Sequence, residues 1–186
     1  MWKLCDLNAG KSKELKLVFS ETLQKIMDEN PNVIALEADL GGASSFLNIK
    51  KTHPDQFLDV GIAEANMIGT AAGLSMLGYI LLSLFLPFAS RRVEDQVFLA
   101  GAYSKNTINI YSSDPGVCAA TNGGTHTSFE DLAFMRLFQK LWYLIRLTMC
   151  SLPGLSGNLF QEKESIISVQ AEKLLPEFMK TALLLK

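Results

Sequence analysis

The stretch from Ala65 to Ser90 contains no charged residue and no histidine, and it limits the folds open to this chain. On length alone it could span a bilayer. Several residues that disfavour such a span interrupt it: Asn66, Gly69, Gly73, Gly78 and Pro87. Its first half also carries small residues at helical spacing. We therefore predict two buried elements, a tightly packed helix over 64–77 and a strand over 79–84. A small membrane-anchored protein is the less favoured alternative.

Strand and helix patterns alternate along the chain. Residues 13–29 place apolar side chains on one helical face, and Asn30-Pro31-Asn32 ends that helix. Further strands are expected over 33–36, 57–61 and 107–111, with a helix over 92–103. This alternation predicts an α/β fold, a mostly parallel sheet with helices on both faces, in one domain over 12–137.

Charge and cysteine content exclude several function classes. The formal net charge is -2, so the chain has no basic surplus for binding nucleic acid. Its cysteines, Cys5, Cys118 and Cys150, are odd in number and lack Cys-x-x-Cys spacing. That pattern argues against a disulfide framework and a structural zinc site, and it favours a cytoplasmic protein.

Two acidic segments stand where an α/β sheet places its ligands. Glu37 to Gly42 supply carboxylates and glycines directly after the strand over 33–36, and open α/β sheets bind ligands beyond the carboxyl ends of their strands. Glu64 opens the uncharged helix, so its carboxylate is expected to be buried. The simpler interpretation of Glu64 is a helix-capping residue that interacts with the helix dipole.

Several motifs together resemble the pyrimidine-binding domain of the transketolase family. The turn Gly61-Ile62-Ala63-Glu64 with its small-residue helix is typical of that domain. Similar segments follow the family order: Glu37 to Leu40, Leu84 to Gln96, Asp114 to Val117, and Gly123 to Arg136. Separated motifs in the same order are more specific than a single glycine pattern. The resemblance covers residues 12–137 and predicts the thiamine-diphosphate-binding fold, incomplete at its C-terminus.

The resemblance implies thiamine diphosphate as cofactor. Glu64 matches the carboxyl group that hydrogen-bonds N1′ of the aminopyrimidine and promotes proton loss from C2. Such a group needs a raised pKa, which burial beside the uncharged helix is expected to supply. The family match also assigns cofactor contacts to four further residues: Asp39, Phe85, Phe88 and Arg91. For Arg91 the alternative is a contact with a partner chain.

His126 and Asn122 are the candidate substrate-binding residues. The resemblance places His126 beside the reacting sugar, as a hydrogen-bonding group that also passes protons. Asn122 stands where the family commonly has an acidic residue that contacts a substrate hydroxyl. The implied activity is two-carbon ketol transfer between phosphorylated sugars.

The sequence also predicts a partner chain. The family's diphosphate-binding domain carries a Gly-Asp-Gly motif, which does not occur here. The chain therefore resembles the C-terminal subunit of a split transketolase, inactive alone. The N-terminal subunit would hold the diphosphate and its magnesium ion, and self-association is also expected. A non-catalytic module that binds a partner is the alternative.

Residues 138–186 depart from the family pattern. None of the motifs expected after Leu137 occurs, although reading from the third base of each codon would allow a Pro-x-Asp segment over 140–151 and an Ile-Arg strand over 164–173. We interpret this tail as frameshifted. It is expected to pack loosely and to leave the sheet without its final strands.

Overall fold

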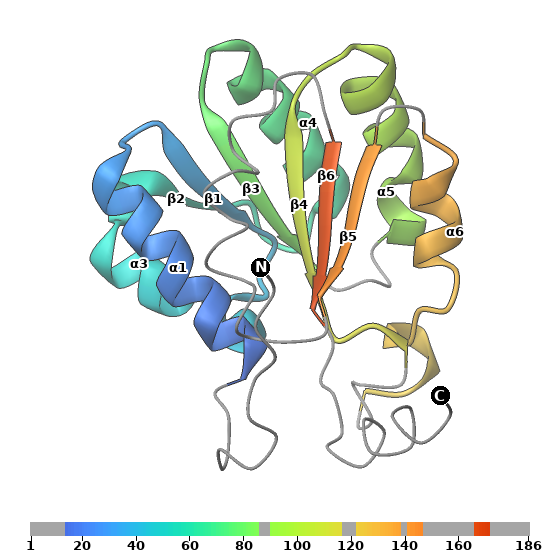
Figure 1. Ribbon diagram of the computed structural model, residues 1–186, viewed down its shortest axis with the longest axis horizontal. Coiled ribbons are helices and arrows are strands. Elements are labelled where there is room, and N and C mark those ends of the chain that lie inside the picture. Colours follow the sequence, from blue (N-terminus) through green and yellow to red (C-terminus); the bar gives the residue numbers. More distant parts are fainter. Residues whose placement is uncertain (1–13, 86–89, 117–121, 139–140, 147–165, 172–186) are drawn as a thin grey trace, which may run out of the picture.

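A computed structural model describes residues 14–85, 90–116, 122–138, 141–146 and 166–171 (Figure 1). Strands and helices alternate along the first two thirds of the chain. The helices and helical turns are α1 (Leu15–Glu29), α2 (Gly41–Ser44), α3 (Leu47–Thr52), η1 (Pro54–Gln56), α4 (Glu64–Met76), α5 (Ser90–Gln96), η3 (Val97–Tyr103), η5 (Gly124–His126) and α6 (Asp131–Arg136). The strands are β1 (Val33–Glu37), β2 (Phe57–Asp59), β3 (Ile80–Phe85), β4 (Ile108–Ser113), β5 (Leu141–Arg146) and β6 (Ile166–Ala171).

The six strands form one sheet in the order β2-β1-β3-β4-β6-β5. Every neighbouring pair runs parallel, so the predicted α/β class with a parallel sheet is confirmed. The predicted strands and helices up to residue 113 also form, within a few residues of their expected bounds.

The expectation that the tail leaves the sheet without further strands is wrong. Strands β5 and β6 both come from the segment after residue 137, and β6 lies between β4 and β5. Both are rich in apolar, aromatic and β-branched residues, which favour strand formation where a sheet edge is open to pairing. The expectation of loose packing concerns side chains outside the described residues.

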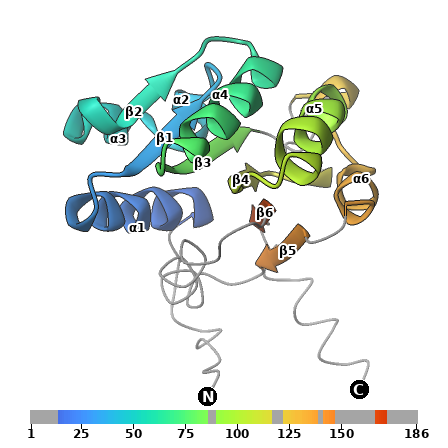
Figure 2. The same cartoon turned by 90° about the horizontal axis from the view of Figure 1, so that it is seen from above.

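Helices cover both faces of the sheet, and Figure 2 shows α1 on one side with α4 and α5 on the other. Strand β1 supplies both faces because successive side chains of a strand point in opposite directions. Val33 and Ala35 pack with residues of α1, whereas Leu36 packs with residues of α4. The strands are therefore apolar on both sides, as in other buried parallel sheets.

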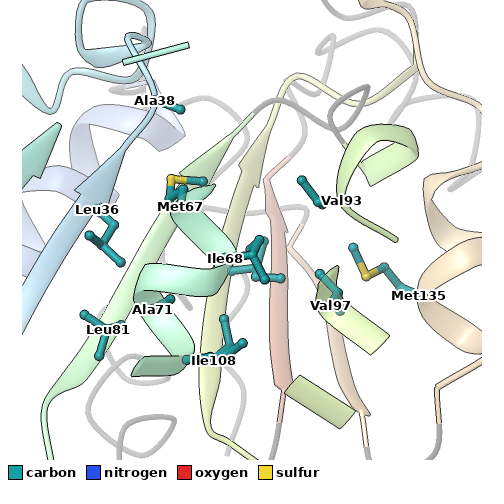
Figure 3. Close-up of a cluster of buried hydrophobic side chains, with 12 residues drawn as sticks. Leu36, Ala38, Met67, Ile68, Ala71, Leu81, Val93, Val97, Ile108 and Met135 are labelled. Atoms are coloured by element: carbon teal, nitrogen blue, oxygen red, sulfur yellow. The ribbon is translucent and has the colours of Figure 1, made fainter. Parts of the chain in front are cut away.

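The larger core cluster joins α4, α5 and α6 to the sheet (Figure 3). Met67, Ile68 and Ala71 project from one face of α4 and are fully buried against strand residues such as Leu81 and Ile108. This burial fixes the rotation of α4 about its axis. It thereby fixes the position of Glu64, the first residue of that helix.

No helix among the described residues is long and apolar enough to cross a membrane. The uncharged stretch divides into α4 and β3, as its glycines predicted.

Candidate functional site

The candidate site lies at the edge of the sheet where the parallel strands have their carboxyl ends. Glu37 pairs in register with Asp59 of β2 on one side and with Leu84 of β3 on the other. Phe85 ends β3 beside Ser112 of β4. The strand-end segments chosen from the sequence therefore do meet at one edge. The side chain of Phe85 and all of Phe88 lie outside the described residues.

Glu64 is buried at the start of α4, as predicted, with 7% of its surface exposed. Its Oε1 atom accepts a hydrogen bond from Nη1 of Arg92 at 2.8 Å. The surroundings of the carboxylate are therefore less apolar than the uncharged stretch suggested. The sequence around Glu64 did not reveal this cation because Arg92 reaches it from α5, which packs against α4.

Two consecutive arginines at the start of α5 bind different segments. While Arg92 binds Glu64, Arg91 binds the loop that contains His126: its Nε lies 2.8 Å from Oε1 of Glu130, and its Nη2 donates to the carbonyl of Thr127 at 2.9 Å. A hydrogen bond from the Phe129 amide lowers the pKa of Glu130, and the charge of Arg91 adds to this effect. The arginine pair thus connects the start of α4 to the His126 loop.

His126 ends the short turn η5 and is partly exposed. Its Nδ1 atom lies 2.9 Å from Oγ1 of Thr125, and the Gly116 amide donates to the carbonyl of Ser128 at 3.0 Å. These contacts hold the loop next to the end of β4. Asn122, the other residue predicted to contact substrate, lies on the same loop and is exposed.

Asp39 lies just beyond β1 with an exposed side chain. Its backbone is left-handed, with φ of 58°, a conformation that aspartate tolerates better than most residues. The Asp39 amide donates to Oδ1 of Asp59 at 3.2 Å. Asp39 therefore stands at the predicted edge, and its carboxylate is open to a ligand or a partner chain.

Glu37 is a buried carboxyl group that belongs to the strand-end segment chosen from the sequence but was not selected as a site residue. Only 1% of its surface is exposed, and its Oε1 accepts a hydrogen bond from the Leu40 amide. Burial, reinforced by the nearby charge of Asp59, raises the pKa of Glu37 to about 7. The sequence feature that could have predicted the burial of Glu37 is its position at the end of a strand whose other residues are all apolar.

A cavity of about 810 Å³ opens beside the arginine pair. Phe98, Tyr103 and Phe138 line it together with the two arginines, and the rings of Phe98 and Phe138 stack 6.2 Å apart. Neither Glu64 nor His126 lines this cavity. The cavity is nevertheless next to the predicted catalytic groups, because Arg92, which lines it, binds Glu64.

Among the described residues, no cluster of three or more histidine, cysteine, aspartate or glutamate side chains could hold a metal ion. The chemistry available at the sheet edge is that of carboxyl groups, arginines and one histidine. Such groups bind and move protons and hold anions.

Residues 11–151 match the family described as "Transketolase, pyrimidine binding domain". The chain is 45% identical over 123 residues to the 6-deoxy-6-sulfo-D-fructose transketolase subunit SqwH of Clostridium sp. (strain MSTE9). The aligned region covers 66% of this chain and 38% of that protein. The chain is also 35% identical over 129 residues to a putative transketolase C-terminal section of Methanocaldococcus jannaschii, covering 69% of this chain and 41% of that protein. The chain thus spans well under half the length of these curated relatives.

Solved structures share the fold. A chain described as "Split gene transketolase, inactive beta4 tetramer" superposes with a TM-score of 0.75 at 23% identity, over 87% of this chain and 52% of that one. A transketolase from Campylobacter jejuni superposes with a TM-score of 0.74 at 14% identity, over 89% of this chain and 28% of that one.

Proposed function

Because the chain belongs to the family of transketolase pyrimidine-binding domains, we propose that it is the pyrimidine-binding subunit of a two-chain transketolase. In this proposal it takes part in two-carbon ketol transfer between phosphorylated sugars and is inactive alone. The observation that carries the proposal is the burial of Glu64 at the first position of α4, at the edge where parallel sheets bind ligands.

The residues at this edge fit the pyrimidine half of thiamine diphosphate. A buried carboxyl group can hydrogen-bond a ring nitrogen in either protonation state, and the ion pair with Arg92 uses only one of the two oxygens of Glu64. When bound, thiamine diphosphate supplies a carbon nucleophile for the sugar's carbonyl group. Glu64 would hold N1′ of the pyrimidine and exchange a proton there, while Phe85 and Phe88 would stack on the ring.

The remaining candidates take supporting roles. Asp39 would lie beside the cofactor at the end of β1. His126 and Asn122 would hydrogen-bond the sugar from the loop that follows β4. The guanidinium of Arg91 already binds Glu130 and Thr127. We therefore propose that Arg91 supports cofactor binding by holding the loop that contains His126, without contacting the cofactor directly.

An exposed, uncharged face of α4 supports the need for a partner chain. Ala65, Asn66, Gly69 and Gly73 are exposed on this helix, and outside the adjacent residues and the helix's own backbone no atom lies within 4 Å of a Cβ placed on either glycine. Ile62, just before the helix, is 75% exposed. We propose that the N-terminal transketolase subunit covers this face and holds the diphosphate and magnesium, in an assembly that also pairs copies of the present chain.

Two relatives guide the proposed substrate class. Their names give a sulfonated sugar for the SqwH protein and apulose 4-phosphate for a subunit from Phocaeicola vulgatus. Both sugars carry an anionic group, which is compatible with the phosphorylated sugars proposed here. The cytoplasmic location expected from the cysteines stays part of the proposal.

The test is reconstitution with the diphosphate-binding chain encoded in the same genome. Thiamine diphosphate is titrated into each chain alone and into the mixture, and ketol transfer from xylulose 5-phosphate is then assayed. Tight cofactor binding and turnover only in the mixture would support the proposal. Complex formation without turnover would favour the non-catalytic partner-binding module instead.

We further propose that residues 138–186 are a frameshifted tail, following a domain that spans 12–137. The family match extends to residue 151, which is beyond the proposed end of the domain. Sequencing the coding DNA tests the proposal. The second frame must encode the Pro-x-Asp segment opposite residues 140–151 and the Ile-Arg strand opposite 164–173. A DNA sequence that encodes neither motif contradicts this proposal.

A further inference from the structure

We infer that Asp59 is a positioning residue, which holds together the strand-end loop that carries Asp39 and the turn that leads into Glu64. Its Oδ1 atom accepts hydrogen bonds from two amides, that of Gly61 at 2.9 Å and that of Asp39 at 3.2 Å. One carboxylate oxygen therefore joins the segments that follow β1 and β2. The consequence for cofactor binding rests on the function proposed above.

Both amide donors belong to residues in the left-handed region. Asp39 has φ of 58° and Gly61 has φ of 73°. A left-handed backbone is less favourable for aspartate than for glycine, so the turn at Asp39 gains from a compensating contact. The hydrogen bond to Asp59 provides one. Charge-assisted hydrogen bonds of this kind are stronger than bonds between neutral groups.

The turn at Gly61 leads directly into α4. The carbonyl of Gly61 accepts a hydrogen bond from the Ala63 amide at 2.7 Å, and the carbonyl of Ala63 accepts one from Met67 within the first turn of the helix. Glu64 directly follows Ala63, the residue that takes part in both hydrogen bonds. A shift of Gly61 would therefore move the start of α4 and its carboxyl group.

Glu37 supports the same arrangement from β1. It is in register with Asp59, its backbone carbonyl accepts the Val60 amide at 2.9 Å, and its carboxyl group accepts the Leu40 amide. Two neighbouring carboxyl groups thus hold the backbone on both sides of Asp39. Burial, reinforced by the like charge of Asp59, favours a proton on Glu37.

Amide hydrogen exchange tests the inference without any cofactor. The full chain is compared with Asp59→Ala, and the amides of Asp39 and Gly61 are followed. Loss of the shared acceptor should speed both by about tenfold, the equivalent of one charge-assisted hydrogen bond. The Val60 amide, which donates to Glu37, is the internal control and should not change. If Asp59→Ala leaves the Asp39 and Gly61 amides unchanged, the inference is wrong.

A second variant covers the case in which Asp59→Ala does not fold. Asp59→Asn keeps a side-chain oxygen but removes its charge, so both amides should exchange about threefold faster. Thiamine diphosphate affinity of the two-chain mixture is measured in parallel and should fall in order from wild type to Asp59→Asn to Asp59→Ala. A wild-type mixture that binds no thiamine diphosphate overturns the proposed function, while the exchange data still decide the role of Asp59.

Discussion

Glu37 and Glu64 are both buried at the carboxyl edge of the sheet, yet their surroundings are opposite in charge. Glu64, at the start of α4, binds the guanidinium of Arg92, which is itself half exposed. Glu37, at the end of β1, binds a backbone amide and lies near the carboxylates of Asp59 and Asp39. The difference teaches that burial alone does not identify a catalytic acid. A cation on a half-exposed side chain can give way to a ligand, whereas a buried carboxyl group bound to the backbone supports the fold.

The largest effect should come from Glu64→Gln. An amide cannot exchange the proton that general acid–base catalysis requires, so turnover of the reconstituted enzyme should fall roughly a hundredfold to ten-thousandfold, with thermal unfolding unchanged. The matched control is Glu37→Gln, which should lose less than about tenfold because Glu37 acts through backbone hydrogen bonds that an amide oxygen can still accept. Equal losses of turnover in the two variants would contradict the prediction that Glu64 has a catalytic role that Glu37 lacks.

Glu37 should make stability depend on pH. Its pKa is raised from 4.5 to about 7 in the folded chain, so the folded state keeps a proton that the unfolded state has lost. Stability should therefore fall as the pH rises from about 4.5 to about 7, by up to about 3 kcal/mol, and then level off. Urea unfolding across this range measures the fall. Glu37→Gln keeps a hydrogen-bond acceptor without titrating, and it should flatten the profile; an unchanged profile assigns the effect to another group.

Arg92→Ala tests the cation beside Glu64. Removing the guanidinium leaves a buried carboxylate without this partner, which should lower the free energy of unfolding by about 1–2 kcal/mol at pH 7. Arg92→Lys, which keeps the charge, should recover part of the loss. Stability equal to wild type in the alanine variant would mean that the burial of Glu64 does not depend on Arg92.

Arg91→Ala should have the smallest effect on stability. The partners of Arg91 are partly exposed, and ion pairs of this kind contribute little to stability. The informative readout is hydrogen exchange at the amides of His126 and Thr127, which should quicken as the loop separates from α5. Glu130→Gln, which weakens the same pair from the other side, should act in the same direction. Unchanged exchange in both variants would show that Arg91 does not hold this loop.

Much of the fold could be predicted because it depends on local patterns. Apolar runs marked β1, β3 and β4, and the uncharged stretch predicted the burial of Glu64. The partnership of Arg92 with Glu64 depends on how α5 packs on α4, which no spacing in the sequence specifies. The burial of Glu37 was not predicted because an acidic residue at a strand end is usually at the surface.

The final strands were missed for a different reason. The expectation of a short sheet rested on the absence of family motifs after Leu137, although strand formation needs only apolar and β-branched residues beside an open edge. Leu141–Arg146 and Ile166–Ala171 supply such residues. Local composition was the better guide to backbone pairing in this segment.

The position of β6 between β4 and β5 also sets an order for assembly during synthesis. The ribosome releases β5 before β6, yet β5 borders only β6 in the sheet. The nascent chain can therefore complete β2-β1-β3-β4 early, while β5 must wait about twenty residues for its neighbour, in the slow, non-local pairing typical of parallel strands. During that interval the edge of β4 is open to any other strand that reaches it, including one from a second nascent chain.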